Sequence, residues 1–85
     1  MVAERHLDQD PRIEAALLEL RALIQARYPT AAFLTFHGDD PAGMYLQATV
    51  EIDDTDEVVD VIIDRLLAMQ VDEGLPVYVL PVRAA

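Results

Sequence analysis

The chain has 85 residues, of which 53% are hydrophobic and 26% are charged, and its formal net charge is −10. This composition excludes a disordered acidic tail, and the length allows one compact domain. The sequence contains no Lys, Ser, Asn, Cys or Trp. It therefore excludes serine and cysteine nucleophiles, Schiff-base lysines, disulfides and thiolate metal sites.

Residues 1–9 are expected to form a flexible tail, and residues 10–83 a single domain. The first ten residues lack the apolar segment of a signal peptide, and no apolar run is long enough to span a bilayer. We therefore expect a soluble, cytoplasmic protein.

The first helix is predicted to begin at Asp10 and Pro11, because an acceptor side chain before a first-turn proline is typical of a helix start. It should end near Arg27, since Pro29 disfavours a helical conformation at Tyr28. Its apolar residues recur at helical spacing and predict one buried stripe: Ile13, Leu17, Leu20 and Ile24.

A β-hairpin should follow. Residues 31–37 favour a short strand, and residues 38–43 contain two glycines and Pro41, which predict a turn with positive φ at the glycines. Residues 44–53 alternate apolar and polar side chains and give the clearest strand in the chain.

The second helix should begin with a capping box in which Asp54 caps free backbone N–H groups and Glu57 reaches back toward the start. Its body runs from Val58 to Met69 or slightly beyond, and Gly74 provides an end signal. Residues 77–82 form the last strand, and the prolines at 76 and 81 favour either a sheet edge or a strand of only four or five residues.

This αββαβ order predicts an α+β, two-layer sandwich with two helices on one face of a three-stranded mixed sheet. A right-handed crossover would make the last strand parallel to the middle one. An alternative leaves a gap between those two strands. The order equals a ferredoxin-like unit without its first strand, whose interior slot could accept a strand from another chain.

Two acidic groups are the starting point for an enzymatic or metal-binding interpretation. Asp39 and Asp40 lie in the turn, and a second group precedes the second helix: Asp53, Asp54, Asp56 and Glu57. Together they could bind Mg²⁺ or Ca²⁺ through oxygen ligands. The structural alternative is that these residues form turns and caps, as aspartate commonly does. We expect no cofactor and no catalytic residue.

Asp56, Asp60 and Asp64 recur every four residues and should share one face of the second helix. They are either a solvated row whose mutual repulsion is partly relieved by Arg65, or a docking stripe for a basic protein.

The sheet face away from the helices is a second candidate interaction surface, formed by Phe33, Tyr45 and Tyr78 with Thr35 and Thr49. In a basic protein such a face would suggest RNA stacking, but the charge here disfavours nucleic acid. It could instead pack on a second subunit, or be covered by a loop or tail of the same chain. His37 beside the acidic turn is a local acid/base grouping, with no nucleophile near it in sequence.

Three segments carry a resemblance: residues 38–46 (GDDPAGMYL), 64–67 (DRLL) and 70–83 (QVDEGLPVYVLPVR). Across residues 11–83 the chain resembles a group of short acidic bacterial proteins to which no activity is assigned. The order of elements is also similar to KH-like type II domains, although the Gly-x-x-Gly loop is absent, so that likeness concerns shape alone.

The sequence therefore predicts a non-enzymatic protein–protein interaction module without membrane or nucleic-acid binding. It would self-associate through its sheet, or present its acidic surface to a basic partner in an antitoxin-like or regulatory role. The alternative is a small metal-dependent enzyme or a metal or ligand sensor that uses the acidic groups.

Overall fold

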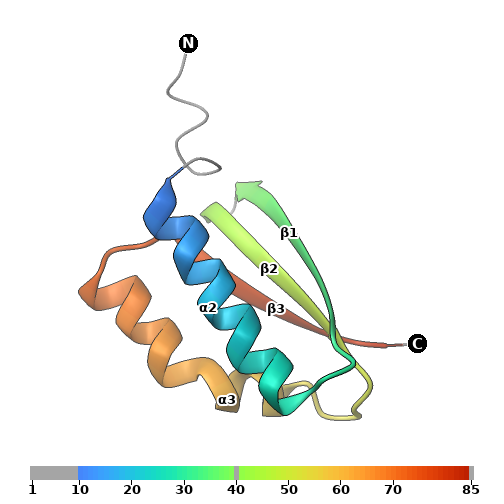
Figure 1. The fold of residues 1–85 in the computed structure, drawn as a ribbon. Helices are drawn as coiled ribbons and strands as arrows, with labels where there is room; N and C mark the ends of the chain where they lie inside the picture. Colours follow the sequence, from blue (N-terminus) through green and yellow to red (C-terminus); the bar gives the residue numbers. More distant parts are fainter. Residues whose placement is uncertain (1–9, 40, 85) are drawn as a thin grey trace.

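The computed structural model describes residues 10–39 and 41–84, so the tail expected at residues 1–9 lies outside the described part. Two helical segments cover one side of a three-stranded sheet, as Figure 1 shows. The predicted α+β sandwich is confirmed. The elements in chain order are α2 (Pro11–Arg27), β1 (Ala32–Asp39), β2 (Ala42–Val50), α3 (Asp56–Leu67), η2 (Ala68–Asp72) and β3 (Val77–Arg83).

The sheet has the order β1-β2-β3, with β1 antiparallel to β2 and β3 parallel to β2. The mixed sheet and the edge position of β3 are therefore confirmed. The alternative with an interior gap is wrong, because β2 and β3 pair directly from Met44 opposite Val77 to Val50 opposite Arg83. Any strand added to this sheet must join at an outer edge.

Helix α2 begins and ends as the sequence predicts. The Asp10 carboxylate accepts a hydrogen bond from the Arg12 backbone N–H at 2.9 Å, and Pro11 occupies the first turn. At the other end, the Tyr28 N–H donates to the Ile24 carbonyl at 2.8 Å, which closes the last turn before Pro29. These two caps satisfy backbone groups that a helix end leaves without an intrahelical partner.

Helix α3 begins without the predicted capping box. The Asp54 carboxylate accepts the Asp56 N–H at 3.0 Å, but the Glu57 carboxylate lies 3.4 Å from the Tyr28 hydroxyl, which donates to it. Glu57 thus links the start of α3 to the end of α2 and does not bond back to its own helix start.

The same helical segment continues slightly beyond Met69, as predicted, and does so in the π-helical turn η2. The Glu73 N–H donates to the Ala68 carbonyl at 3.1 Å, which is the five-residue spacing of a π-turn. Gly74 follows with φ +64°, as an end signal requires. The Gln70 side-chain amide then donates to the Val77 carbonyl at 2.7 Å and joins the turn to β3.

The hairpin is tighter than predicted. Strand β1 continues through Gly38 and Asp39, and β2 already begins at Ala42, so residues 40 and 41 alone separate the two strands. Neither Gly38 nor Gly43 has a positive φ. Strand β2 also ends earlier than expected, at Val50.

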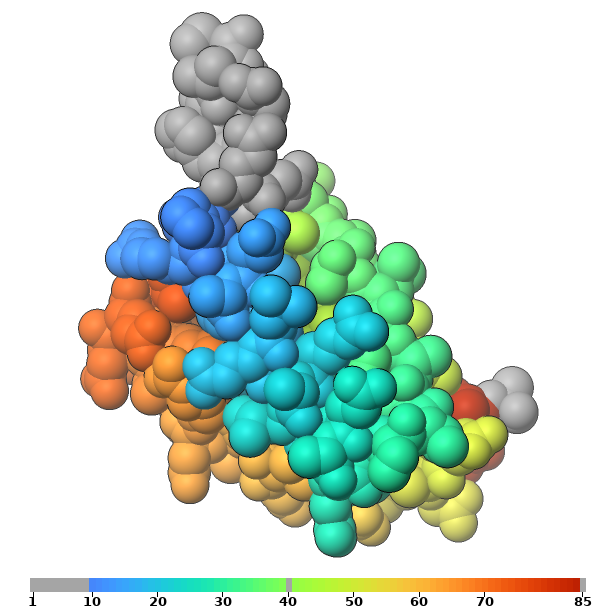
Figure 2. Space-filling view, viewed as in Figure 1, coloured from blue at the N-terminus to red at the C-terminus, as the bar shows by residue number. Residues whose placement is uncertain are grey.

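The core lies between the helices and the helix-facing side of the sheet. Both helical segments, β2, and the start of β3 contribute to it, and Figure 2 shows how α2 crosses this side of the molecule. The most deeply buried large side chains are Leu20, Ile24, Leu46, Val50, Val58, Ile62, Met69 and Val77.

Candidate functional site

The two sides of the sheet differ in what covers them. Alternate residues of a strand point to opposite sides, and residues paired across strands share a side. The side that carries the buried Leu46 and Ala48 faces the helices. We call the other side the open face; the strand pairing assigns to it Ala32, Leu34, Phe36, Tyr45, Gln47, Thr49, Tyr78, Leu80 and Val82.

A row of three aromatic rings crosses the open face from β1 to β3. The Phe36 and Tyr45 rings stack with centroids 5.4 Å apart and an interplanar angle of 11°, and the Tyr45 and Tyr78 rings lie 5.0 Å apart at 32°. The Tyr45 hydroxyl donates to the Pro41 carbonyl at 2.7 Å, which ties the centre of the row to the hairpin loop. The row is therefore a fixed part of the sheet.

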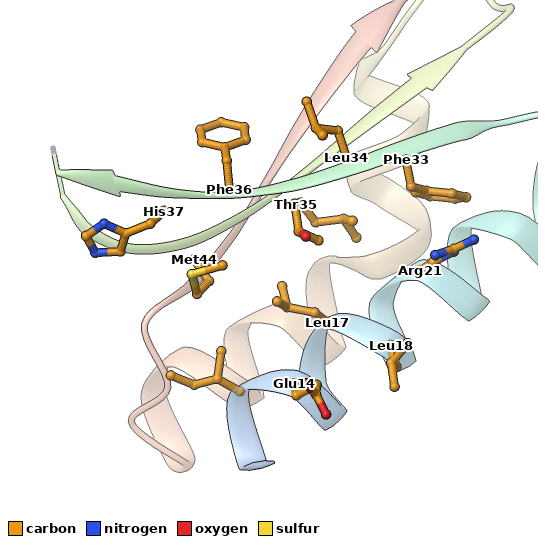
Figure 3. A pocket seen from close by; sticks show the side chains of 12 residues that line it. Glu14, Leu17, Leu18, Arg21, Phe33, Leu34, Thr35, Phe36, His37 and Met44 are labelled. Atoms are coloured by element: carbon orange, nitrogen blue, oxygen red, sulfur yellow. The ribbon is translucent and has the colours of Figure 1, made fainter. Parts of the chain in front are cut away.

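The prediction that Phe33 belongs to this face is wrong, as is that for Thr35. Phe33 pairs with Ala48 and packs against the core, with the Arg21 guanidinium 5.1 Å from the centre of its ring. Figure 3 shows Phe33 and Thr35 on the helix side of β1 and Phe36 on the opposite side. Phe36 takes the predicted place of Phe33, while Tyr45, Thr49 and Tyr78 lie on the open face as predicted.

The open face is apolar and carries no charged side chain within the described strands. Leu34 is 57% exposed, Leu80 39% and Val82 38%. In all three strands the charged residues are Asp39 and Arg83, and each is the last residue of its strand. The chain has a net charge of −10, and most charged side chains among the described residues therefore lie on the helices and loops.

A groove lies between α2 and β1, on the helix side of the sheet, and has a volume of about 710 Å³. We call it the edge groove. Leu17, Phe33 and Met44 contribute apolar walls, and Glu14, Arg21 and His37 add polar groups at the positions seen in Figure 3. His37 is exposed, and the described neighbours supply it with no hydrogen-bond partner.

The acidic groups do not converge on one site. Asp39 ends β1 at the hairpin, whereas Asp53, Asp54, Asp56 and Glu57 follow the far end of β2, and Asp40 lies outside the described residues. Nine residues of β2 separate the two ends, a span of roughly 26 Å at about 3.3 Å per residue. Within residues 10–39 and 41–84, no three carboxylates or histidines are placed to hold a metal ion.

The acidic row of α3 is exposed as predicted: Asp56, Asp60 and Asp64 all face solvent. The expectation that Arg65 relieves this row is wrong. Its guanidinium binds Glu19 of α2, with Nη2 to Oε1 at 3.0 Å, and Glu73 after η2, with Nη1 to Oε2 at 2.7 Å. Arg65 therefore links the two helices, and the row has no cationic partner among the described residues.

The bridge from Arg65 changes the acid stability of the domain. Its hydrogen bonds hold the pKa of Glu19 below the ordinary value of 4.5, against a smaller opposing effect of desolvation. A carboxylate with a lowered folded-state pKa stabilises the fold above its unfolded pKa, and this contribution is lost as pH falls through the folded pKa.

We therefore expect Glu19→Gln to lower the free energy of unfolding at pH 7 by less than about 1 kcal/mol, because the Glu19 side chain is 44% exposed. The difference from the unchanged protein should shrink to nothing as the pH falls well below 4.5. Urea unfolding across this pH range measures it. Glu51→Gln is the matched control, since Glu51 is exposed and has no ion pair with a described residue; an equal loss there would contradict the role of the bridge.

Sequence reasoning missed Phe36, Leu34, Leu80 and Val82 as members of the open face. Simple alternation from Tyr78 along residues 77–82 identifies Leu80 and Val82. The β1 residues needed the register with β2, which depends on the length of the hairpin loop.

Comparisons with known proteins add no relative to this description. No family model matches the chain, and no curated protein or solved structure matches it either. None of the described helices combines the length and the apolar character that crossing a membrane requires.

Proposed function

We propose that this chain is a non-enzymatic protein–protein interaction module that self-associates through its sheet. The observation that carries the proposal is the confinement of charge: strand side chains are uncharged except for Asp39 and Arg83 at the strand ends. Two copies of net charge −10 repel each other wherever their helices and loops meet. The sheet is where two copies can approach without bringing like charges together.

The apolar character of the open face supports the proposal. Leu34 is exposed on β1 at one end of the aromatic row, and covering it with a second copy removes apolar area from water at a gain of about 25 cal/mol per Å². An exposed, contiguous apolar patch is typical of an interaction site. A docking site for a basic protein would instead need the acidic row of α3, which lies on the helix side of the molecule.

Salt dependence separates these two modes of association. Raising NaCl from about 0.1 M to about 1 M shortens the Debye length from about 10 Å to about 3 Å and weakens repulsion between acidic copies. We expect sedimentation at increasing protein concentration to show an average mass above 9.5 kDa that is unchanged or larger at high salt. A mass of one chain at all concentrations and both salts would contradict self-association. Salt-sensitive binding of a basic protein by this monomer would favour the acidic row.

A further inference from the structure

The two edges of the sheet are protected to different degrees. Strand β3 contains Pro81 and follows Pro76, and a proline offers no N–H to a neighbouring strand. Strand β1 contains neither proline nor lysine, and it pairs with β2 without a bulge from Ala32 opposite Thr49 to Asp39 opposite Ala42. Prolines, lysines and bulges are features with which proteins commonly prevent a further strand from pairing with a sheet edge. Among the described residues no strand pairs with the outer side of β1, which is therefore an open edge, eight residues long.

The edge groove lies directly beside this open edge. Helix α2 packs mainly over β2 and β3, which leaves the helix side of β1 partly uncovered. Leu18 of α2 is 59% exposed and lines the groove together with Phe33 and Thr35. A strand added to β1 would place alternate side chains in this groove and the others on an extension of the open face.

We infer that the added strand is β1 of a second copy, paired antiparallel about a two-fold axis at Thr35. This inference rests on the proposed self-association and specifies its geometry. Two three-stranded sheets would then form one continuous sheet with all helices on one side. On the open face, Leu34 of each copy would pair with Phe36 of the other, and the aromatic rows of both copies would join one uncharged surface.

The level of α2 along β1 places the groove-lining residues of the helix relative to this axis. Arg21 lies over Phe33, and α2 and β1 run in opposite directions (Figure 1). Two strand residues advance about 6.6 Å, which equals between four and five helical residues at about 1.5 Å each. Leu17 of α2 is therefore nearly level with Thr35. Glu14, seven residues or about 10.5 Å before Arg21, lies within about 3 Å of the level of His37, which is about 13 Å from Phe33.

Charge complementarity supports a second copy of the chain as the occupant. The two-fold axis at Thr35 brings Phe33 of one copy opposite His37 of the other, and so brings Arg21 of one copy to within about 3 Å of the level of Glu14 of the other. Among the described residues, neither Glu14 nor Arg21 forms an ion pair within its own chain. The interface would therefore contain two reciprocal Arg21–Glu14 pairs on either side of Leu18, in an isologous arrangement typical of homodimers.

The test measures the dimer dissociation constant by analytical ultracentrifugation for a charge-reversal series. Glu14→Arg places two arginines together at each end of the interface, and we expect it to weaken the dimer roughly tenfold or more. Arg21→Glu should do the same with two carboxylates. The double variant Glu14→Arg/Arg21→Glu exchanges the partners and should restore the dissociation constant to within about threefold. Recovery in the double variant cannot come from a loss of folding.

Two further variants separate this geometry from face-to-face packing. Thr35 is exposed, and Thr35→Lys should give a folded monomer because two ammonium groups would meet at the two-fold axis. Leu80→Asp, on the open face, should leave the dimer intact. If Leu80→Asp abolishes the dimer and Thr35→Lys does not, self-association stands and the β1 pairing is overturned. A dimer unaffected by the charge reversals also overturns it, and an unchanged protein that is monomeric throughout contradicts the proposed function itself.

Discussion

Leu20→Ala is expected to lower the free energy of unfolding by about 2–5 kcal/mol, the range seen when a large aliphatic side chain is removed from a closed core. Leu20 is fully buried in the middle of α2 and belongs to the cluster shared by both helices and the sheet. The loss combines the transfer free energy of the removed atoms with the cost of the cavity that remains. A chain of 85 residues has little stability to spare, so this variant should be close to unfolding at 37 °C.

Leu18→Ala is the matched control for this prediction. Leu18 lies in the same helix, two residues earlier, and is 59% exposed. Because the residue types are the same, intrinsic helix propensity contributes equally to both variants. Denaturant unfolding monitored by circular dichroism at low protein concentration compares them as monomers. Equal losses at the two positions would contradict the placement of the α2 buried stripe.

Gly43→Ala is expected to lower the free energy of unfolding by about 1–3 kcal/mol, as overpacking in a closed site does. A Cβ atom at Gly43 would lie 2.5 Å from the Pro76 carbonyl oxygen and 2.6 Å from a Tyr78 ring carbon. The same carbonyl accepts the Met44 N–H at 2.9 Å, where the parallel pairing of β2 and β3 begins. Relief of the clash therefore requires backbone movement between the two strands.

The control for Gly43→Ala is Gly74→Ala, which should lower the free energy of unfolding for a different physical reason. A Cβ at Gly74 meets no atom within 4 Å, so its cost is the left-handed conformation at φ +64°, about 1–2 kcal/mol. The two variants should also differ in tyrosine fluorescence, because of the two glycines only Gly43 lies against the ring of Tyr78. An unchanged emission for Gly43→Ala, with stability equal to that of the original protein, would contradict the close approach of β2 and β3.

Local signals in the sequence are sufficient for the element order and for most boundaries. Asp10 and Pro11 define the start of α2, Gly74 defines the end of the second helical segment, and the prolines around β3 indicate an edge. Each of these signals acts through a backbone preference that depends on few neighbours. The mixed sheet follows from connection length and handedness, which are equally general.

The candidate site is harder to predict because it depends on register. A six-residue turn over residues 38–43 leaves the pairing of β1 undetermined, and the prediction for Phe33 fails for this reason. In the structure, Gly38 and Gly43 are paired strand residues whose missing side chains make room for the rings of Tyr45 and Tyr78. Glycine thus serves close packing here, and that use is not visible from turn statistics. The role of Arg65 escapes sequence reasoning as well, because Glu19 is 46 residues away in the chain.

The π-helical turn η2 limits changes of chain length between α3 and β3. Backbone bonds fix the passage at successive points: the Glu73 N–H donates to Ala68, the Leu75 N–H to Met69, and the Pro76 carbonyl accepts from Met44. A residue added or removed between these bonds shifts the residues beyond it by one position, and a one-residue shift of a strand exchanges the faces of its side chains. Leu75 and Val77 would then leave the core. Insertions or deletions in natural variants of this domain should therefore be absent from residues 68–77, however exposed Val71 is at the surface.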